Sequence, residues 1–233
     1  MKKCMLGFRH GLVAAALALA VAPGIGVAAN PGKGINLGQM RTLAAAWWQW
    51  ALSIPAVNHP LSFVTPDESA PYCGVGQHGD VWFLGGLVNA SSPAERACTI
   101  PESTAIFFPV INAECSTIEG NGETEEELRA CAEGLIDFVT VVEASVDGVP
   151  IRSLKRARAQ SSLFSFMLPP GDVLSLYGNE PNPSAAVADG YWVLLPPLSV
   201  GEHTIEFRGV IELPGFIFEQ EISYAVTVVP AFR

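Results

Sequence analysis

The sequence contains none of several short motifs that mark common enzyme classes. It has no G-x-S-x-G nucleophile elbow, no H-E-x-x-H zinc motif, no P-loop and no C-x-x-C pair. Each of these motifs places a nucleophile, a metal, a phosphate or a redox thiol at a defined point of a fold. Their absence leaves the common serine hydrolase, zinc protease, P-loop and thiol-redox mechanisms without a local signature.

Positive charge is scarce. The 13 Lys and Arg residues are outnumbered by 23 Asp and Glu residues, and three of the 13 fall within the first nine positions. Without residues 1–29 the chain keeps ten basic and 23 acidic residues, a formal charge of −13. Such an acidic surface repels the phosphates of nucleic acids and anionic membranes. We therefore expect neither as a partner.

Long apolar runs are also lacking beyond the N-terminus. There, Lys2, Lys3 and Arg9 precede an apolar stretch from Leu12 to Val21, and Val27-Ala28-Ala29 offers the small residues that signal peptidase requires. The stretch is shorter than the roughly 20 residues that span a bilayer. We predict a signal peptide over residues 1–29 and a secreted or periplasmic protein without a membrane span.

Four cysteines remain after that segment: Cys73, Cys98, Cys115 and Cys131. An even number in an oxidising compartment predicts two disulfides, and four cysteines allow three pairings. We favour Cys73 with Cys98 and Cys115 with Cys131, because each pair brackets one local unit of structure. A zinc site is the alternative, but no two of these cysteines have the close spacing that zinc sites use.

Two segments have helical patterns. Leu43, Trp47, Trp50 and Ile54 recur at i, i+4, i+7 and i+11, which predicts an amphipathic helix over residues 37–54. Thr124 and Glu127 form a capping-box pattern that predicts a short helix over residues 125–134. Between them, residues 56–79 are rich in Pro, Gly, Ser and Asp and are expected to form a long ordered loop.

The rest of the chain has strand patterns. Short apolar or alternating runs are separated by Pro, Gly and Asn, and Asp147-Gly148 is a strong hairpin signal. Since one face of each late strand is apolar, two sheets should pack together. We predict a mainly β fold: a β-sandwich of immunoglobulin-like or jelly-roll type, with an N-terminal amphipathic helix and one further short helix, forming a single domain over residues 30–233. The expected strands cover residues 81–84, 96–99, 105–108, 138–146, 163–168, 172–177, 191–195, 202–210 and 216–229.

Several motifs give the chain a family resemblance. They are Trp47-x-x-Trp50, Cys73-x-x-x-Gln77-x-Gly79-x-Val81-Trp82-Phe83-Leu84, Cys98-Thr99-Ile100-Pro101 and Phe107-Phe108-Pro109-x-x-Asn112-x-Glu114-Cys115. Together they resemble a group of secreted bacterial proteins of uncharacterised activity, which implies export but no reaction. The segment from Pro197 to Phe207 is similar to the closing hairpin of immunoglobulin-like modules, and this similarity implies only a fold.

Polar residues at strand ends are the first candidates for a site. Gln77, His78 and Asp80 lead into the strand at residue 81, and Asn112 and Glu114 follow the strand at residue 105. Together they could line one pocket mouth, with Glu114 or Asp80 and His78 as an acid/base pair. The alternative is that Gln77 and Asn112 satisfy backbone groups in a tight turn braced by a disulfide.

Aromatic residues offer a second candidate. Trp47, Trp50, Trp82 and Trp192 fall in apolar patterns and are expected in the core. Trp48 lies off the helix stripe, so it is the tryptophan we would test for stacking on a ligand.

Metal and anion sites are weaker hypotheses. His59, His78 and His203 with Glu114 could ligate a metal but share no short ligand spacing. The acidic segment 114–127 does not follow the order of a calcium loop. Arg152, Lys155, Arg156 and Arg158 could dock an anionic glycan, or form a solvated loop. We therefore predict no metal and no cofactor.

The sequence favours a non-catalytic binding protein for an extracellular or periplasmic partner, glycan or small ligand. The alternative is a secreted hydrolase or metal-dependent enzyme that uses His78, Asp80 and Glu114.

Overall fold

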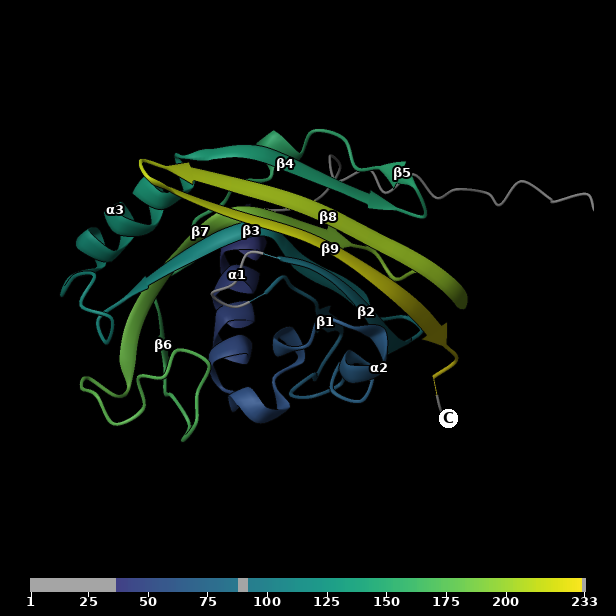
Figure 1. The fold of residues 1–233 in the computed structure, drawn as a ribbon, viewed down its shortest axis with the longest axis horizontal. Coiled ribbons are helices and arrows are strands. Elements are labelled where there is room, and N and C mark those ends of the chain that lie inside the picture. The colour runs from purple at the N-terminus through teal and green to yellow at the C-terminus, as the bar shows by residue number, and fades with distance from the viewer. Residues whose placement is uncertain (1–36, 88–91, 232–233) are drawn as a thin grey trace, which may run out of the picture.

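The computed structural model describes residues 37–87 and 92–231 (Figure 1). The predicted signal peptide lies outside the described residues. The chain begins with α1 (Leu37–Leu52), two 3-10 turns, η1 (Ala56–Asn58) and η2 (Pro60–Ser62), and α2 (Pro66–Ser69). It continues with β1 (Val81–Phe83), β2 (Ser92–Pro101), β3 (Ala105–Ser116), α3 (Glu125–Ile136), β4 (Val139–Val146) and β5 (Val149–Pro150). It closes with η3 (Leu154–Arg156), β6 (Phe164–Phe166), β7 (Ser184–Leu195), β8 (Gly201–Leu213) and β9 (Phe216–Val229).

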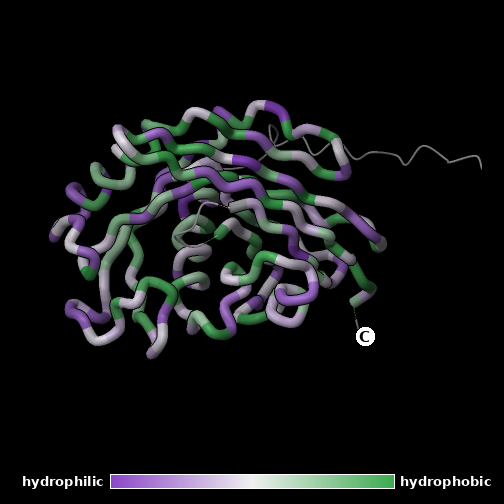
Figure 2. The backbone as a smooth tube through the Cα atoms, in the orientation of Figure 1, coloured by the Kyte–Doolittle hydropathy of each residue, from purple (hydrophilic) through white to green (hydrophobic). Residues whose placement is uncertain are grey.

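These strands form two packed sheets, which confirms the predicted sandwich. Sheet A has the order β1-β3-β7-β6, and sheet B has the order β2-β9-β8-β4-β5. Along β8 and β9, hydrophilic and hydrophobic residues alternate (Figure 2). Because successive side chains of a strand point to opposite faces, this alternation turns one face of sheet B inward. The immunoglobulin-like or jelly-roll subtype stays a prediction.

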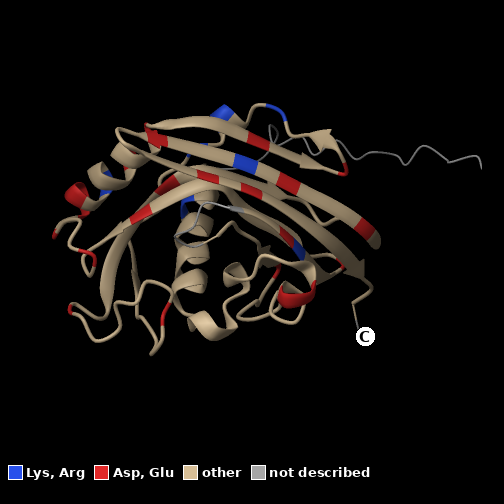
Figure 3. Cartoon of the chain, in the orientation of Figure 1, with Lys and Arg blue, Asp and Glu red and all other residues tan. Residues whose placement is uncertain are grey.

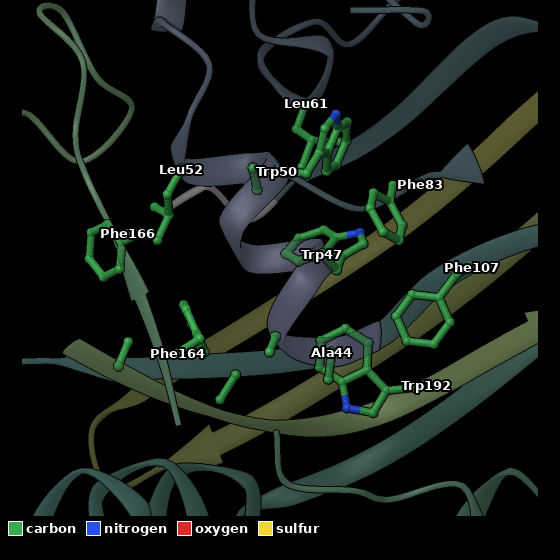
Figure 4. Packing of buried hydrophobic residues seen from close by; sticks show 14 of the residues in the cluster. Ala44, Trp47, Trp50, Leu52, Leu61, Phe83, Phe107, Phe164, Phe166 and Trp192 are labelled. Atoms are coloured by element: carbon green, nitrogen blue, oxygen red, sulfur yellow. The ribbon is translucent and has the colours of Figure 1, made fainter. Parts of the chain in front are cut away.

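Sheet A is buried on both faces. On one face, Phe108 of β3 stacks on Phe207 of β8, with ring centroids 5.0 Å apart, in the core between the sheets. On the other face, Phe107 stacks on Trp192 at 5.3 Å, and Trp47 of α1 packs against Trp192 at 6.0 Å (Figure 4). This double burial explains why β3 reads as an uninterrupted apolar run in the sequence.

Both favoured disulfides are confirmed. Cys73 and Cys98 join the turn after α2 to β2, with Cα atoms 5.4 Å apart. Cys115 and Cys131 join β3 to α3, with Cα atoms 6.1 Å apart. Two such bonds within one chain indicate an oxidising environment. None of the helices in the described residues has the length and hydropathy needed to cross a bilayer.

The strand predicted over residues 172–177 is wrong. The buried carboxylate of Asp172 accepts backbone hydrogen bonds from Leu174 at 2.8 Å, Leu176 at 3.2 Å and Tyr177 at 2.9 Å. An aspartate that bonds nearby backbone N–H groups stabilises a turn, which competes with an extended strand. Strand β7 also begins at Ser184, earlier than expected, and the predicted loop 56–79 contains η1, η2 and α2.

One edge of β3 is only partly covered. β1 pairs with residues 105–107 and ends at Phe83, and no described strand pairs with β3 beyond Phe107 on that side. Instead, Gln220 of β9 crosses from sheet B and donates a hydrogen bond from Nε2 to the Val110 carbonyl at 2.7 Å. The two sheets are therefore linked here by a side chain, and space remains beside the strand.

Candidate functional site

A cavity of about 530 Å³ lies beside the partly covered edge of β3. This volume lies within the range of about 300 to 1,000 Å³ that is usual for small-molecule sites. Its walls come from α1, the end of β3, α3 and the β8–β9 hairpin, and most of them are apolar. The lining residues are Trp47, Trp48, Leu61, Gly86, Leu87, Asn112, Ala113, Glu114, Glu119, Leu135, Leu174, Ile211, Leu213, Phe216, Phe218 and Gln220.

Two adjacent glycines let the chain pass the cavity closely. A Cβ atom on Gly85 would lie 2.5 Å from the Trp47 ring, and a Cβ atom on Gly86 would lie 1.7 Å from Gln220 Oε1. Real Cβ atoms essentially never approach other heavy atoms this closely. The Gly85-Gly86 pair therefore allows Trp47 and Gln220 to pack against the backbone that forms the cavity wall.

Three residues of the cavity carry buried polar atoms without a partner. Trp48 Nε1, Asn112 Nδ2 and both carboxyl oxygens of Glu114 accept or donate no hydrogen bond within the described residues. These are four of the five such atoms in the described chain. Because roughly 90% or more of buried polar groups are hydrogen-bonded, their convergence on one cavity needs an explanation.

The other tryptophans around α1 differ from Trp48. Trp47 Nε1 donates to the Leu84 carbonyl at 2.7 Å, Trp50 Nε1 to Val75 at 3.0 Å, and Trp192 Nε1 to Ala159 at 2.9 Å. All three rings are buried in the core, as the sequence predicts. Trp82 is partly buried, and its Nε1 is the fifth unpartnered atom, but Trp82 does not line this cavity.

The electrostatics of the cavity centre on Glu114. Burial raises the pKa of the Glu114 carboxyl well above its ordinary value, and the negative charge of Glu119 raises it further. Glu119 is near enough to accept a hydrogen bond from Glu114 only if Glu114 is protonated, which acts in the same direction; the nearby Ser116 hydroxyl acts the opposite way, although neither group hydrogen-bonds the ionised carboxylate. Ser116 Oγ itself donates to Glu119 Oε2 at 2.8 Å. Glu114 therefore tends to hold its proton when the cavity has no positive charge.

The site residues predicted from the sequence do not all line the same cavity. His78 and Asp80 are exposed and line a second cavity of about 350 Å³, next to Trp50 and Val81. His78 Nδ1 lies 2.9 Å from the Gly76 carbonyl, and no hydrogen bond or ion pair joins His78 to Asp80 or Glu114 within the described residues. Asn112, Glu114 and Trp48, by contrast, all line the larger cavity.

Gln77 serves the backbone, as the alternative hypothesis held. Its Nε2 donates to the Phe83 carbonyl at 2.8 Å, and its Oε1 accepts from the Phe83 N–H at 2.9 Å. An expectation that the chain lacks a G-x-G-x-x-G motif is wrong, because Gly74, Gly76 and Gly79 have that spacing. They lie in a turn that leads into β1 rather than between a strand and a helix, so the context of a dinucleotide site is absent.

The three histidines within the described residues lie in three different environments. His59 is buried, with Nε2 2.7 Å from the Ala51 carbonyl and Nδ1 accepting from Leu61 N–H at 3.1 Å. Burial lowers its pKa to about 4, the Ala51 bond opposes this, and the nearby Arg96 charge lowers it further.

Within the described residues, no three His, Cys, Asp or Glu side chains converge as a metal ion requires.

His203 forms a contact with the composition of a catalytic triad. Its Nδ1 lies 2.8 Å from Asp147 Oδ2, and its Nε2 lies 3.2 Å from Ser199 Oγ and 2.8 Å from the Ser199 carbonyl. Although partial burial lowers the His203 pKa, its bonds to Asp147 and Ser199 raise it overall. The Ser199 carbonyl can only accept a hydrogen bond, so Nε2 donates to it and is not placed to take a proton from the Ser199 hydroxyl. The contact fixes the β4–β5 turn to the start of β8.

The charged segments also have structural partners. Arg158 bridges Asp189 at 2.8 Å and Asp137 at 2.7 Å, so it does not belong to a solvated loop. In the acidic segment 114–127, Glu127 caps the first turn of α3 through the Thr124 and Glu123 N–H groups, which lowers its pKa.

The cavity brings together residues that are far apart in the sequence. Asn112, Glu114 and Trp48 were candidates from the sequence, whereas Glu119, Leu135 and Phe218 were not. Comparisons of the chain with protein-family models, with curated proteins and with solved structures found no match.

Proposed function

We propose that this protein is an exported, non-catalytic binding protein that takes a small amphipathic molecule into the cavity beside β3. The predicted signal peptide and the two disulfides support export. The observation that carries the binding function is the convergence of unpartnered Trp48, Asn112 and Glu114 groups on one largely apolar cavity.

The energetic cost of unpartnered buried groups supports a binding function. Leaving a buried donor or acceptor unsatisfied costs about 1 to 3 kcal/mol. Proteins commonly keep residues that lower stability where those residues are needed for binding. A ligand with an apolar body and a polar end would fill the apolar walls and supply the missing hydrogen bonds.

Catalysis is less well supported. An acid/base pair must lie within hydrogen-bond reach of the same substrate atoms, but Glu114 lines one cavity and His78 and Asp80 line another.

The test uses Nile red, a neutral fluorescent dye with an apolar body and oxygen acceptors. Residues 30–233 should bind the dye saturably, with enhanced fluorescence. Trp48→Phe should weaken binding about fivefold to tenfold, because it removes one hydrogen-bond donor worth about 1 to 1.5 kcal/mol.

Trp82→Phe is the matched control, since it removes another unpartnered indole N–H outside the cavity. Its dye affinity should equal that of the wild type. Absence of saturable binding, or equal losses in both variants, would contradict the proposed function. Melting curves of both variants establish that they fold.

A further inference from the structure

Building on the proposed function, we propose that the cavity selects an organic cation: a protonated amine on an apolar body, with Glu114 and Glu119 as its counter-ions.

The charged groups that face the cavity are of one sign. β3 contributes Glu114 and the turn after it contributes Glu119, while α1 contributes the neutral Trp47 and Trp48. From α3, β8 and β9 the cavity receives only apolar side chains and the Gln220 amide. Among the described lining residues there is no Lys, Arg or His. An anionic ligand would therefore enter a site without a counter-charge.

The two carboxyls also repel one another. Glu114 is removed from water and lies close to the charge of Glu119, and both effects disfavour its ionised form. A neutral ligand can hydrogen-bond to protonated Glu114 but brings no charge that would make ionisation of Glu114 favourable. A cation pairs with both carboxylates, so it removes the repulsion and makes ionisation of Glu114 favourable.

Aromatic residues also line this cavity. Trp47, Trp48, Phe216 and Phe218 line the same cavity, and the faces of aromatic rings attract cations. Trp48 Nε1 and Asn112 Nδ2 are donors, which an ammonium cannot satisfy. The fullest fit is therefore an amine that also carries an oxygen acceptor near its charged end.

The test compares three probes with the same chain and different head groups: octylammonium, octanol and octanoate. At pH 7, calorimetry should show octylammonium binding at least tenfold tighter than octanol, and octanoate binding weakest. Octylammonium should also release protons on binding, because Glu114 ionises. Titration in two buffers of different ionisation enthalpy counts these protons.

Glu114→Gln should abolish the proton release and reduce the preference for octylammonium over octanol at least fivefold. Glu95→Gln is the matched control. It removes an equal charge from the outer face of sheet B, where acidic residues are spread along the strands (Figure 3). If Glu95→Gln reduces octylammonium binding as much, bulk charge explains the selectivity and the inference is overturned.

Failure of this inference differs from failure of the proposed function. Equal binding of octanol and octylammonium, tighter binding of octanoate, or Nile red binding without any octyl probe would overturn the cation inference and leave the binding function standing. Absence of binding by Nile red and all three octyl probes would overturn both.

Discussion

At the scale of single residues, the tryptophans separate by what their indole N–H groups meet. Trp47, Trp50 and Trp192 each donate to a backbone carbonyl and anchor the core, whereas Trp48 leaves its donor unused in the cavity. Burial alone would not distinguish them, because Trp48 also packs against the core. The hydrogen-bond inventory does, and it identifies Trp48 as the ring available to a ligand.

Glu114 should make stability depend on pH in a characteristic direction. Its pKa in the folded protein is raised above the ordinary value of 4.5. A group with a raised pKa contributes stability that is fully present below its unfolded pKa and is lost as the pH rises toward its folded pKa. Glu114→Gln removes this loss, so the variant should melt at a higher temperature than the wild type at pH 7.

The difference in melting temperature should shrink as the pH falls to 4, where the wild-type carboxyl is mostly protonated in both the folded and the unfolded state. Circular dichroism melts of the two proteins at pH 4, 5.5 and 7 measure it. A variant that is less stable than the wild type at pH 7 would contradict this prediction, because it would show that Glu114 stabilises the fold.

At the scale of elements, Arg96 of β2 forms hydrogen bonds that hold in place the loops lining part of the cavity. Its buried guanidinium donates to the carbonyls of Leu61 at 2.9 Å, Phe63 at 2.7 Å and Gly85 at 2.7 Å. It also reaches the Gly86 carbonyl and the Tyr224 hydroxyl. One planar side chain thereby holds η2 and the glycine pair against sheet B.

Arg96→Lys should destabilise the protein by about 2 to 4 kcal/mol, because a single ammonium cannot reach acceptors spread around a planar guanidinium. Urea unfolding with disulfides intact measures the change. Arg208→Lys is the control, since Arg208 lies on the partly exposed outer face and pairs with Glu219. A change of about 0.5 kcal/mol or less is expected there. Similar losses at both sites would refute the role of Arg96.

Elements with strong local patterns could be predicted from the sequence. The alternation of β8 and β9 and the capping box of α3 depend on neighbouring residues, so they were predictable. The turn at Asp172 was not, because apolar residues after it have the pattern of a strand while its side chain bonds the backbone.

The candidate site was predictable only in part. Asn112 and Glu114 stood out because they are polar residues directly after an apolar run, although β3 continues through them to Ser116. Their separation from His78 follows from the parallel pairing of β1 and β3, a tertiary feature, which places the residues before β1 at the start of β3. Leu135 and Phe218 could not be assigned, since apolar residues on α3 and β9 look the same in sequence whether they face a core or a cavity.

At the scale of the whole molecule, the two disulfides secure different regions. Cys115–Cys131 holds α3 on β3, and α3 brings Leu135 to the cavity. Cys73–Cys98 holds the turn after α2 on β2, and neither cysteine lines that cavity. The two bonds should therefore have similar effects on stability and different effects on binding.

Replacing either pair by alanine should cost about 3 kcal/mol, because each bond closes a loop of comparable length. Only Cys115→Ala with Cys131→Ala should weaken Nile red binding, by at least fivefold, since α3 can then move away from β3. Cys73→Ala with Cys98→Ala should keep the affinity of its folded fraction. Equal affinity losses in the two double variants would contradict this division.

The early end of β1 has a further consequence for how copies of this protein meet. A strand without a neighbour offers backbone groups to which another chain can add, a common start of aggregation. Gln220 already occupies the Val110 carbonyl on this edge, and two glutamates stand beside it. A bound ligand would cover the rest of this edge. At high concentration the ligand-free protein should therefore aggregate sooner than the ligand-bound protein.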